Sequence, residues 1–120
     1  MYKVIFYRDK NGDEQVKEYI DGLAAKTDKS SRIKLNKIMD YIDYLAAYGL
    51  TSNANVMKHI EGDIWELRPM RDRIFFVCWL GDTFILLHQF IKKSQKTPQR
   101  EIDQAKREYA DIIERSNNNE

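Results

Sequence analysis

The sequence has little that could support a disulfide framework or a structural metal site. Among 120 residues there is one cysteine, Cys78, and there are two histidines, His59 and His88. A single thiol forms neither an intrachain disulfide nor a CxxC motif, and these three residues fall short of the four ligands of a structural zinc site. The fold must therefore be stabilised by an apolar core, and no metal is expected.

Long apolar runs are also missing. No run approaches the roughly 18 residues that span a bilayer, and residues 1–4 do not begin the apolar stretch of a signal peptide. We therefore expect a cytoplasmic protein without a membrane partner. With 42% hydrophobic and 32% charged residues, the chain has the composition of a single globular domain. That domain is predicted over residues 1–115, with a polar tail at 116–120.

The chain has no large charge of one sign. Its 20 Lys and Arg against 19 Asp and Glu give a net charge of +1, which suggests no general affinity for polyanions. Residues 64–100, however, hold seven basic and three acidic residues, so this segment carries +4 and the rest of the chain −3. Such a segment can bind phosphate in a nearly neutral protein. An ordinary solvated surface is the alternative.

The spacing of apolar residues predicts an N-terminal strand followed by two helices. Residues 2–7 have the aromatic and β-branched content of a strand. A helical period follows from Asn11, with Asn11 and Glu14 as a capping pair. A second helix is expected from Ser30 to Gly49, where the glycine ends it. The two helices should form an antiparallel hairpin.

After the polar loop 51–55 the period falls to two, which predicts antiparallel strands. The predicted strands are 56–60, 64–68, 73–80 and 83–93. A two-residue turn with glycine first is expected at 81–82. Thr97 as a cap and Pro98 as the first helical residue predict a C-terminal helix. The sequence thus predicts an α+β fold: a strand, a helical hairpin, a mainly antiparallel sheet of four or five strands, and a final helix.

The lengths of the turns predict the strand registers, and the registers predict which side chains share a face. The expected partners are Leu80 with Thr83, Phe75 with His88, Arg73 with Phe90, Arg71 with Lys92, Arg68 with Arg73, and Glu66 with Phe75. Residues that lie opposite each other point to the same side of a sheet. The side chains expected to cluster, with Lys92 one diagonal step away, are Glu66, Arg68, Arg73 and His88.

Two arginines directly opposite each other repel, so the pair Arg68 and Arg73 requires an anion nearby. Glu66 could supply it internally, as part of a surface network of little energetic weight. A nucleic-acid phosphate could supply it externally, because the planar guanidinium donates two parallel hydrogen bonds. The spacing leaves both interpretations open.

The histidines and the basic loop are weaker candidates. His88 lies in an apolar strand, where a histidine is most often a core residue, and His59 is near the turn before Trp65. Either could move a proton near neutral pH. Trp65 is either a core residue or a base-stacking platform. The loop 92–96 is either solvated or part of a basic patch with the two arginines.

Three stretches of the sequence resemble the phage-derived, Gp49-like branch of the HigB toxins in the RelE superfamily. They are IWELR at 64–68, RIFFV at 73–77 and LHQFIKKSQKTP at 87–98. The resemblance implies a RelE-like fold and an mRNA endoribonuclease that needs no metal or other cofactor and acts in the ribosomal A site. It also implies a cognate HigA-like helix-turn-helix antitoxin that holds the toxin inactive.

Carried over by residue, the resemblance places Arg73 at the strand arginine that grips the scissile phosphate, with Arg68 as its neighbour. Lys92 and Lys93 fall where the superfamily keeps a pair of basic residues. The C-terminal tyrosine of RelE has no counterpart, because residues 95–98 read QKTP. The predicted catalytic residues are Arg68, Arg73, His88 and Lys93. The predicted nucleic-acid-binding residues are Arg71, Lys92, Lys96, Lys58, His59 and Trp65.

The expected chemistry is attack of a 2′-hydroxyl on its own 3′ phosphate, with arginines stabilising the developing charge and a lysine or histidine moving protons. Three other functions remain open at this point. The protein could be a binding module for nucleic acid or antitoxin that cleaves nothing, a ParE-like inhibitor of DNA gyrase, or a degenerate toxin kept for operon regulation.

Overall fold

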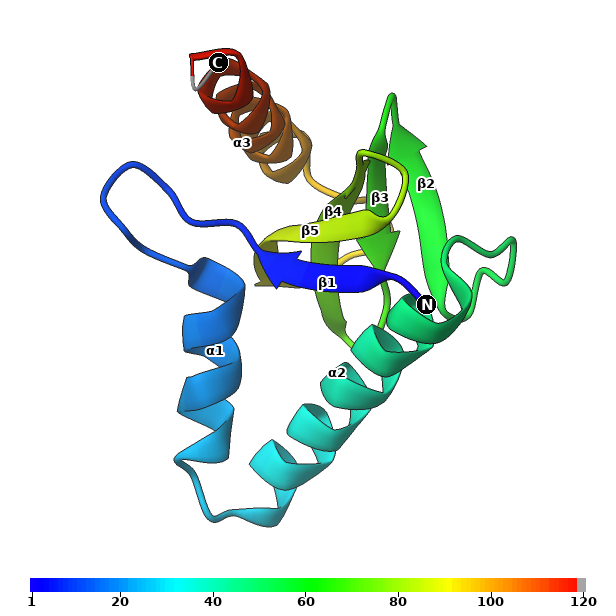
Figure 1. Cartoon of the computed structure of the whole chain (residues 1–120). Coiled ribbons are helices and arrows are strands. Elements are labelled where there is room, and N and C mark those ends of the chain that lie inside the picture. Colours follow the sequence, from blue (N-terminus) through cyan, green and yellow to red (C-terminus); the bar gives the residue numbers. More distant parts are fainter. Residues whose placement is uncertain (119–120) are drawn as a thin grey trace.

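The elements follow the predicted order in the computed structural model, which describes residues 1–118 (Figure 1). They are β1 (Lys3–Phe6), α1 (Gln15–Ala24), α2 (Lys29–Tyr48), β2 (Met57–Glu61), β3 (Ile64–Leu67), β4 (Asp72–Trp79), β5 (Thr83–Ile91) and α3 (Gln99–Asn118). The strands form one sheet in the order β1-β5-β4-β3-β2. β1 runs parallel to β5, and the other neighbours are antiparallel. The α+β prediction is confirmed.

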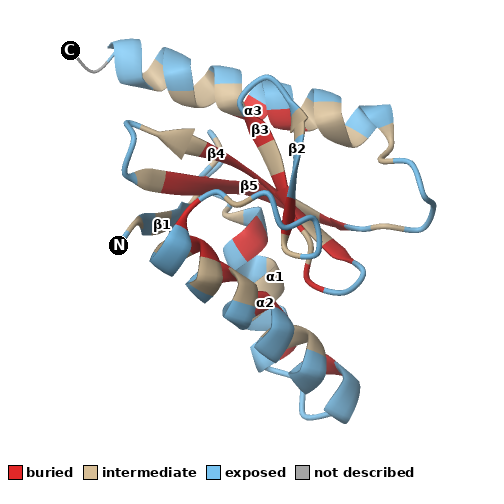
Figure 2. Cartoon of the chain, turned by 90° about the vertical axis from the view of Figure 1, so that its right-hand side faces the viewer, coloured by how far each residue is buried: buried red, intermediate tan, exposed pale blue. Residues whose placement is uncertain are grey.

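Helices cover both faces of the sheet. The V-shaped pair α1 and α2 packs on one face, and α3 packs on the other (Figure 1). Because both faces are covered, the central residues of β4 and β5 are buried on both sides (Figure 2). This explains why their sequences read as continuous apolar runs rather than as alternating ones. Among residues 1–118, no helix combines the length and apolar character needed to cross a membrane.

The helices begin close to their predicted positions, but the predicted N-cap of α1 differs from the structure. The side chain of Asp28 accepts the backbone N–H of Ser31 and so caps α2. The capping pair predicted for α1 is wrong, because this helix begins only at Gln15. Instead, the carboxylate of Asp9 accepts the backbone N–H groups of Asn11 and Asp13 at 2.8 and 2.9 Å. These residues therefore form a closed loop before the helix.

The turn between β4 and β5 differs from the prediction. Trp79, not Leu80, lies opposite Thr83, so the loop has three residues instead of two. Leu80 and Gly81 both have positive φ angles, 55° and 81°. The predicted two-residue turn failed because nothing in the sequence marks Leu80 as a residue that adopts this rare backbone conformation.

A β-bulge restores the predicted register further along the same strands. Leu87 is an extra residue in β5, between the pairs that Phe76 and Phe75 make. Beyond the bulge, Phe75 pairs with His88 and Arg73 with Phe90, as predicted. The longer turn and the bulge therefore offset each other, and Arg73 is placed where the sequence predicted it.

The C-terminal helix begins at Gln99, one residue later than predicted, with Pro98 directly before it. It continues to Asn118 and so includes the first part of the predicted polar tail 116–120. Asn119 and Glu120 lie outside the described residues.

Candidate nucleic-acid interface

Two arginines flank a fully buried carboxylate at the start of β4 and the end of β3. Glu66 is 0% exposed, and its Oε2 atom lies 3.5 Å from Nε of Arg68 and 4.0 Å from Nε of Arg73. Across β3 and β4, Glu66 pairs with Phe75 and Leu67 pairs with Ile74. If this register is continued by one residue, Arg68 stands opposite Arg73, and the two arginines come together beside Glu66. We call these residues, Glu66, Arg68 and Arg73, the arginine cluster.

Backbone carbonyl groups hold the two guanidinium groups in place. Nη1 of Arg68 donates to the carbonyl of Ala54 at 2.7 Å. Nη1 of Arg73 donates to the carbonyls of Met70 and Asp72 at 2.8 and 2.9 Å. Nε of Arg73 and both carboxylate oxygens of Glu66 are buried without a hydrogen-bond partner among the described residues. The cluster is thus rigid, yet it retains unused hydrogen-bonding capacity.

Two lysines extend the positive charge around the cluster. Burial lowers the pKa of Lys92; Glu66 opposes this shift, and the positive charges of Arg73, Arg68 and Lys58 strengthen it. Lys58 stands opposite Glu66 in the β2–β3 pair, so it lies on the same face of the sheet. Burial also lowers the pKa of Arg73. Four cations therefore surround one carboxylate, which leaves a local excess of positive charge that attracts anions.

Arg73 separates two open hollows, each of about 360 Å³. The basic hollow is lined by Met70, Arg71, Arg73, Lys92, Lys93, Ser94 and Gln95. The α2 hollow is lined by Lys37, Tyr41, Ala54, Asn55, Arg68, Met70 and Arg73. A third hollow, of about 540 Å³, shares Lys93 and Ser94 with the basic hollow. The three hollows together form a row of concave surface, in which Arg73 lies between the basic hollow and the α2 hollow.

The predicted binding residues of the loop are exposed near this row. Arg71 and Lys93 line the basic hollow, and the carbonyl of Arg71 accepts the backbone N–H of Lys92 at 2.9 Å. Lys96 is exposed in the connection before α3, where its carbonyl accepts the hydroxyl of Ser94. A mobile anionic chain lying in the basic hollow would meet Arg71 and Lys93 directly.

His88 makes its hydrogen bonds with α3 and not with the arginine cluster. Its Nδ1 lies 2.6 Å from Oε1 of Glu108, and its Nε2 lies 3.1 Å from Oε1 of Glu101. The residue is only 1% exposed. The register confirms that His88 shares a face of the sheet with Glu66 and Arg73, as predicted, but its ring contacts the carboxylates of α3 instead of the arginines. With both ring nitrogens occupied, His88 cannot reach a phosphodiester unless α3 moves away.

His59 and Trp65 lie on the opposite side of the sheet from Glu66. They pair across β2 and β3, and their rings meet edge to face with centroids 5.4 Å apart. Nε2 of His59 also lies 2.7 Å from the carbonyl of Gly62. Because side chains alternate along a strand, neither residue shares the face of Lys58 and the arginine cluster. The structure thus separates them from the other predicted binding residues.

The sequence patterns did not identify the residues of α2 that lie near the arginine cluster. Lys34, Lys37 and Tyr41 follow an i, i+3, i+7 spacing, which places them along one side of the helix. This pattern was available in the sequence, but nothing in it showed that this side of the helix approaches the arginines. The partners of His88 were missed for the same reason, since α3 is distant in the chain.

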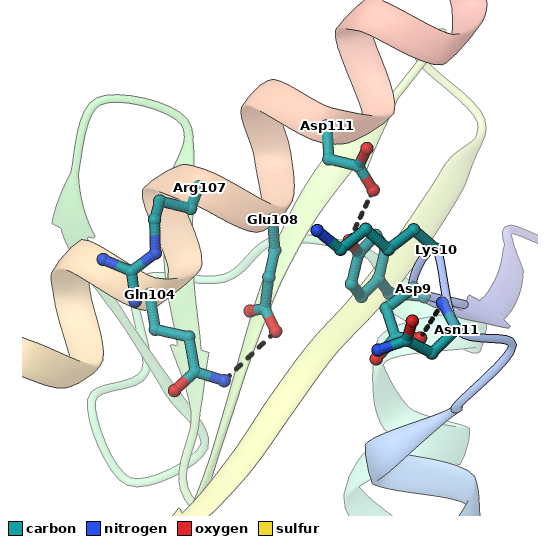
Figure 3. Close-up of a pocket in the computed structure, with 8 residues that line it drawn as sticks. Asp9, Lys10, Asn11, Gln104, Arg107, Glu108 and Asp111 are labelled. Carbon is teal, nitrogen blue, oxygen red and sulfur yellow. Dashed lines mark hydrogen bonds between the residues drawn. The ribbon is translucent and has the colours of Figure 1, made fainter.

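A further hollow lies between α3 and the loop after β1, and none of the residues of the arginine cluster lines it (Figure 3). It measures about 330 Å³, and its lining residues carry charges of both signs. The hydroxyl of Tyr7 donates to Asp111 at 2.5 Å, and Gln104 donates to Glu108 at 3.2 Å. These polar groups already hydrogen-bond to one another. The row of three hollows around Arg73 is therefore the better candidate site.

The model of a protein family, the phage-derived Gp49-like proteins, matches residues 19–110. The chain belongs to this family. The match includes α2, the arginine cluster and the loop 92–98, so the whole basic surface lies inside the Gp49-like region. The Gp49-like family is related to the RelE-like toxins and is associated with toxin–antitoxin systems. A search of curated protein sequences finds no significant match.

Proposed function

We propose that this protein is a HigB-type toxin that cleaves translated mRNA in the ribosomal A site. Its compartment would be the cytoplasm, and a HigA-like helix-turn-helix antitoxin would hold it inactive. The observation that carries the proposal is the arginine cluster, in which two anchored guanidinium groups share one buried carboxylate beside an open basic hollow. In a family of RelE-like toxins, such a surface fits the phosphate of an RNA chain.

The proposed reaction is an internal transfer of a phosphoryl group. The ribose 2′-oxygen forms a bond to the adjacent phosphorus, and the bond from phosphorus to the 5′-oxygen of the next nucleotide breaks. The products are a 2′,3′-cyclic phosphate and a free 5′-hydroxyl. Negative charge builds up on the phosphoryl oxygens during attack, and Arg73 and Arg68 would stabilise it. Because carbonyl groups already fix both side chains, little reorganisation is needed.

A lysine is the best available group for proton transfer. The lowered pKa of Lys92 brings it closer to the pH at which an amine can both lose and regain a proton. Lys93 is more exposed and would contact the RNA backbone from the same hollow. We place His88 in the attachment of α3 and not in the reaction, because its buried ring contacts two carboxylates of that helix. The ribosome would align the reacting atoms and so provide the remaining rate acceleration.

Mapping of mRNA 5′ ends after brief induction in bacteria tests the proposal. The wild type is compared with Arg73→Ala. Arg32→Ala serves as a matched control, because Arg32 is exposed on α2 and lines none of the three hollows around Arg73. Loss of a charge-stabilising group at a reacting phosphate typically lowers the rate about 100- to 1,000-fold. We expect new ends within translated regions for the wild type and Arg32→Ala, and almost none for Arg73→Ala.

Two outcomes would contradict the proposal. If induced wild-type protein accumulates in folded form without new mRNA ends, the protein is not this nuclease, and DNA breaks in the same cells would indicate inhibition of gyrase. If Arg73→Ala cuts as well as the wild type, the reaction does not depend on the arginine cluster. Circular dichroism of each purified variant verifies that the fold is retained.

A further inference from the structure

The α2 hollow adjoins the proposed cleavage site and adds two residues of α2, Lys37 and Tyr41, that the proposed cleavage does not use. Arg68 and Arg73 border it on the sheet side, and Lys37 and Tyr41 border it on the helix side. None of the described residues that line it is acidic. Its volume of about 360 Å³ lies within the range of roughly 300–1,000 Å³ that is common for sites of small organic ligands. Cations on both sides and an aromatic ring suit an anionic, flat ligand.

The walls of this hollow are tied together by hydrogen bonds. Arg68 donates to the carbonyl of Ala54, and the hydroxyl of Tyr41 donates to the carbonyl of Asn55 at 3.4 Å. Both carbonyls belong to the loop before β2, which therefore connects the helix side to the sheet side. Tyr41 also packs against the core at its inner edge while remaining partly exposed. Its ring is thus fixed in position and still accessible.

We propose that the α2 hollow binds the base of the nucleotide next to the phosphate held by Arg73, with Tyr41 as the stacking platform and Lys37 on the neighbouring phosphate. This inference rests on the proposed function, because it takes single-stranded RNA as the ligand. Aromatic rings combined with a cationic groove are the common means of binding single strands. Because Arg73 borders both hollows, one chain can place a phosphate at Arg73 and a base on either side.

The aromatic ring of the proposed site comes from α2 and not from the segment that follows β5. The positions after the basic loop carry no tyrosine, since residues 95–98 read QKTP. Tyr41 lines the hollow beside Arg68 and Arg73 from a separate element, α2. Selection of the base would then depend on the helix side of the hollow, while the grip on the phosphate depends on the arginine cluster.

Binding of a short RNA that cannot be cleaved tests the inference. The probe is a fluorescent single-stranded RNA of seven nucleotides with 2′-O-methyl groups, titrated with protein and followed by fluorescence anisotropy. Loss of one stacked base lowers affinity about tenfold. We expect that loss for Tyr41→Ala, and affinity within about twofold of wild type for Tyr41→Phe, which keeps the ring. Tyr48→Ala is the matched control, because Tyr48 is 69% exposed on the same helix and does not line the hollow.

The salt dependence of binding tests Lys37 separately. Removing one phosphate contact lowers the slope of log affinity against log salt by about 0.7 for a single strand. We expect this change for Lys37→Gln and not for Lys29→Gln, an exposed lysine at the start of α2. The thermal midpoint of each variant verifies that the change in binding is not a loss of folding.

The outcomes separate this inference from the proposed function. If Tyr41→Ala binds the probe like the wild type, or if the wild type does not bind it, the α2 hollow is not a nucleotide site. This holds even when mRNA cleavage is observed. If mRNA cleavage is absent but Tyr41→Ala weakens binding and Tyr48→Ala does not, the nucleotide site stands and the nuclease proposal fails. Where cleavage occurs, Tyr41→Ala should also change the nucleotides found beside the cut.

Discussion

At the scale of single residues, two buried carboxylates of this protein differ in how they are satisfied. Asp72 accepts hydrogen bonds from the hydroxyl of Tyr19 at 2.8 Å and from the side chain of Gln89 at 2.9 Å. Glu66 is equally buried, yet neither of its carboxylate oxygens has a hydrogen-bond partner within residues 1–118. Asp72 therefore connects α1 to the sheet. Glu66 neutralises charge without fixing the geometry of its partners.

Replacing Glu66 with glutamine should destabilise the protein in a way that an anion repairs. Glu66→Gln keeps the shape but leaves Arg68 and Arg73 without their shared counter-charge. We expect a loss of about 1–3 kcal/mol in the free energy of unfolding, typical of a buried group that loses its partner. Inorganic phosphate should then raise the melting temperature of the variant more than that of the wild type.

Thermal melts in phosphate and in chloride at equal ionic strength measure this effect. Asp43→Asn, an exposed change on α2, controls for the loss of one negative charge. An equal shift with phosphate in the wild type and in Glu66→Gln would show that Glu66 does not compete with anions for the two arginines.

At the scale of elements, the end of α2 depends on one glycine. Gly49 has a φ angle of 72°, and its N–H donates to the carbonyl of Leu45 at 2.9 Å. A Cβ atom at this position would lie 2.7 Å from a ring carbon of Tyr2. Both the backbone conformation and the close approach of Tyr2, which directly precedes β1, therefore require glycine here.

Two glycine-to-alanine changes should have opposite effects on stability. Gly49→Ala should lower the free energy of unfolding by about 1–3 kcal/mol from backbone strain alone, and the contact with Tyr2 adds to this cost. Gly22→Ala, in α1, meets no atom within 4 Å and should raise stability by roughly 0.5–1 kcal/mol. Chemical denaturation of both variants measures the difference. A destabilised Gly22→Ala, or an unchanged Gly49→Ala, would contradict this account.

At the scale of the whole molecule, α3 is attached to the sheet by an apolar stripe and by polar contacts. Ala105 is buried against the sheet, and His88 contacts Glu108 and Glu101. The hydroxyl of Tyr109 donates to Asp63 at 3.0 Å near the far end of the sheet. Among these polar contacts, the one between His88 and Glu108 is buried on both sides. It should therefore control how readily α3 separates from the sheet.

Removal of Glu108 should loosen α3 more than the rest of the fold. Glu108→Ala leaves Nδ1 of His88 buried without a partner, which costs about 1–3 kcal/mol. We expect faster hydrogen exchange in the amides of α3, with a smaller change in β4. Glu114→Ala, an exposed change on the same helix, is the control. Equal acceleration throughout the sheet would show that α3 and the sheet unfold as one unit.

The predictable parts of this protein depend on short-range patterns. The order of elements followed from changes of period between helix and strand, which act within a few residues. The approach of Glu66, Arg68 and Arg73 followed from alternation and from one short turn. The predicted cap of α1 was wrong because the side chain of Asp9 holds residues 11–13 in a loop, and the predicted turn was wrong because Leu80 adopts a positive φ angle that its residue type does not favour.

The site could be predicted only where it lies on neighbouring strands. Arg68 and Arg73 are close in the chain, so their pairing was available from the sequence. Lys37 and Tyr41 join them from α2, and Glu108 reaches His88 from α3. These contacts depend on how helices pack across the two faces of the sheet, which no local spacing describes.

The sequence alone therefore determined the α+β class, the order of the elements, the basic segment and the pair of arginines around Glu66. The tertiary structure decided that His88 contacts the carboxylates of α3, that Trp65 and His59 lie on the other face, and that α2 completes the concave surface beside Arg73. The physical reason is range. Periodicity and turn geometry act between neighbours in the chain, whereas burial and the meeting of distant helices are set by the packing of the whole core.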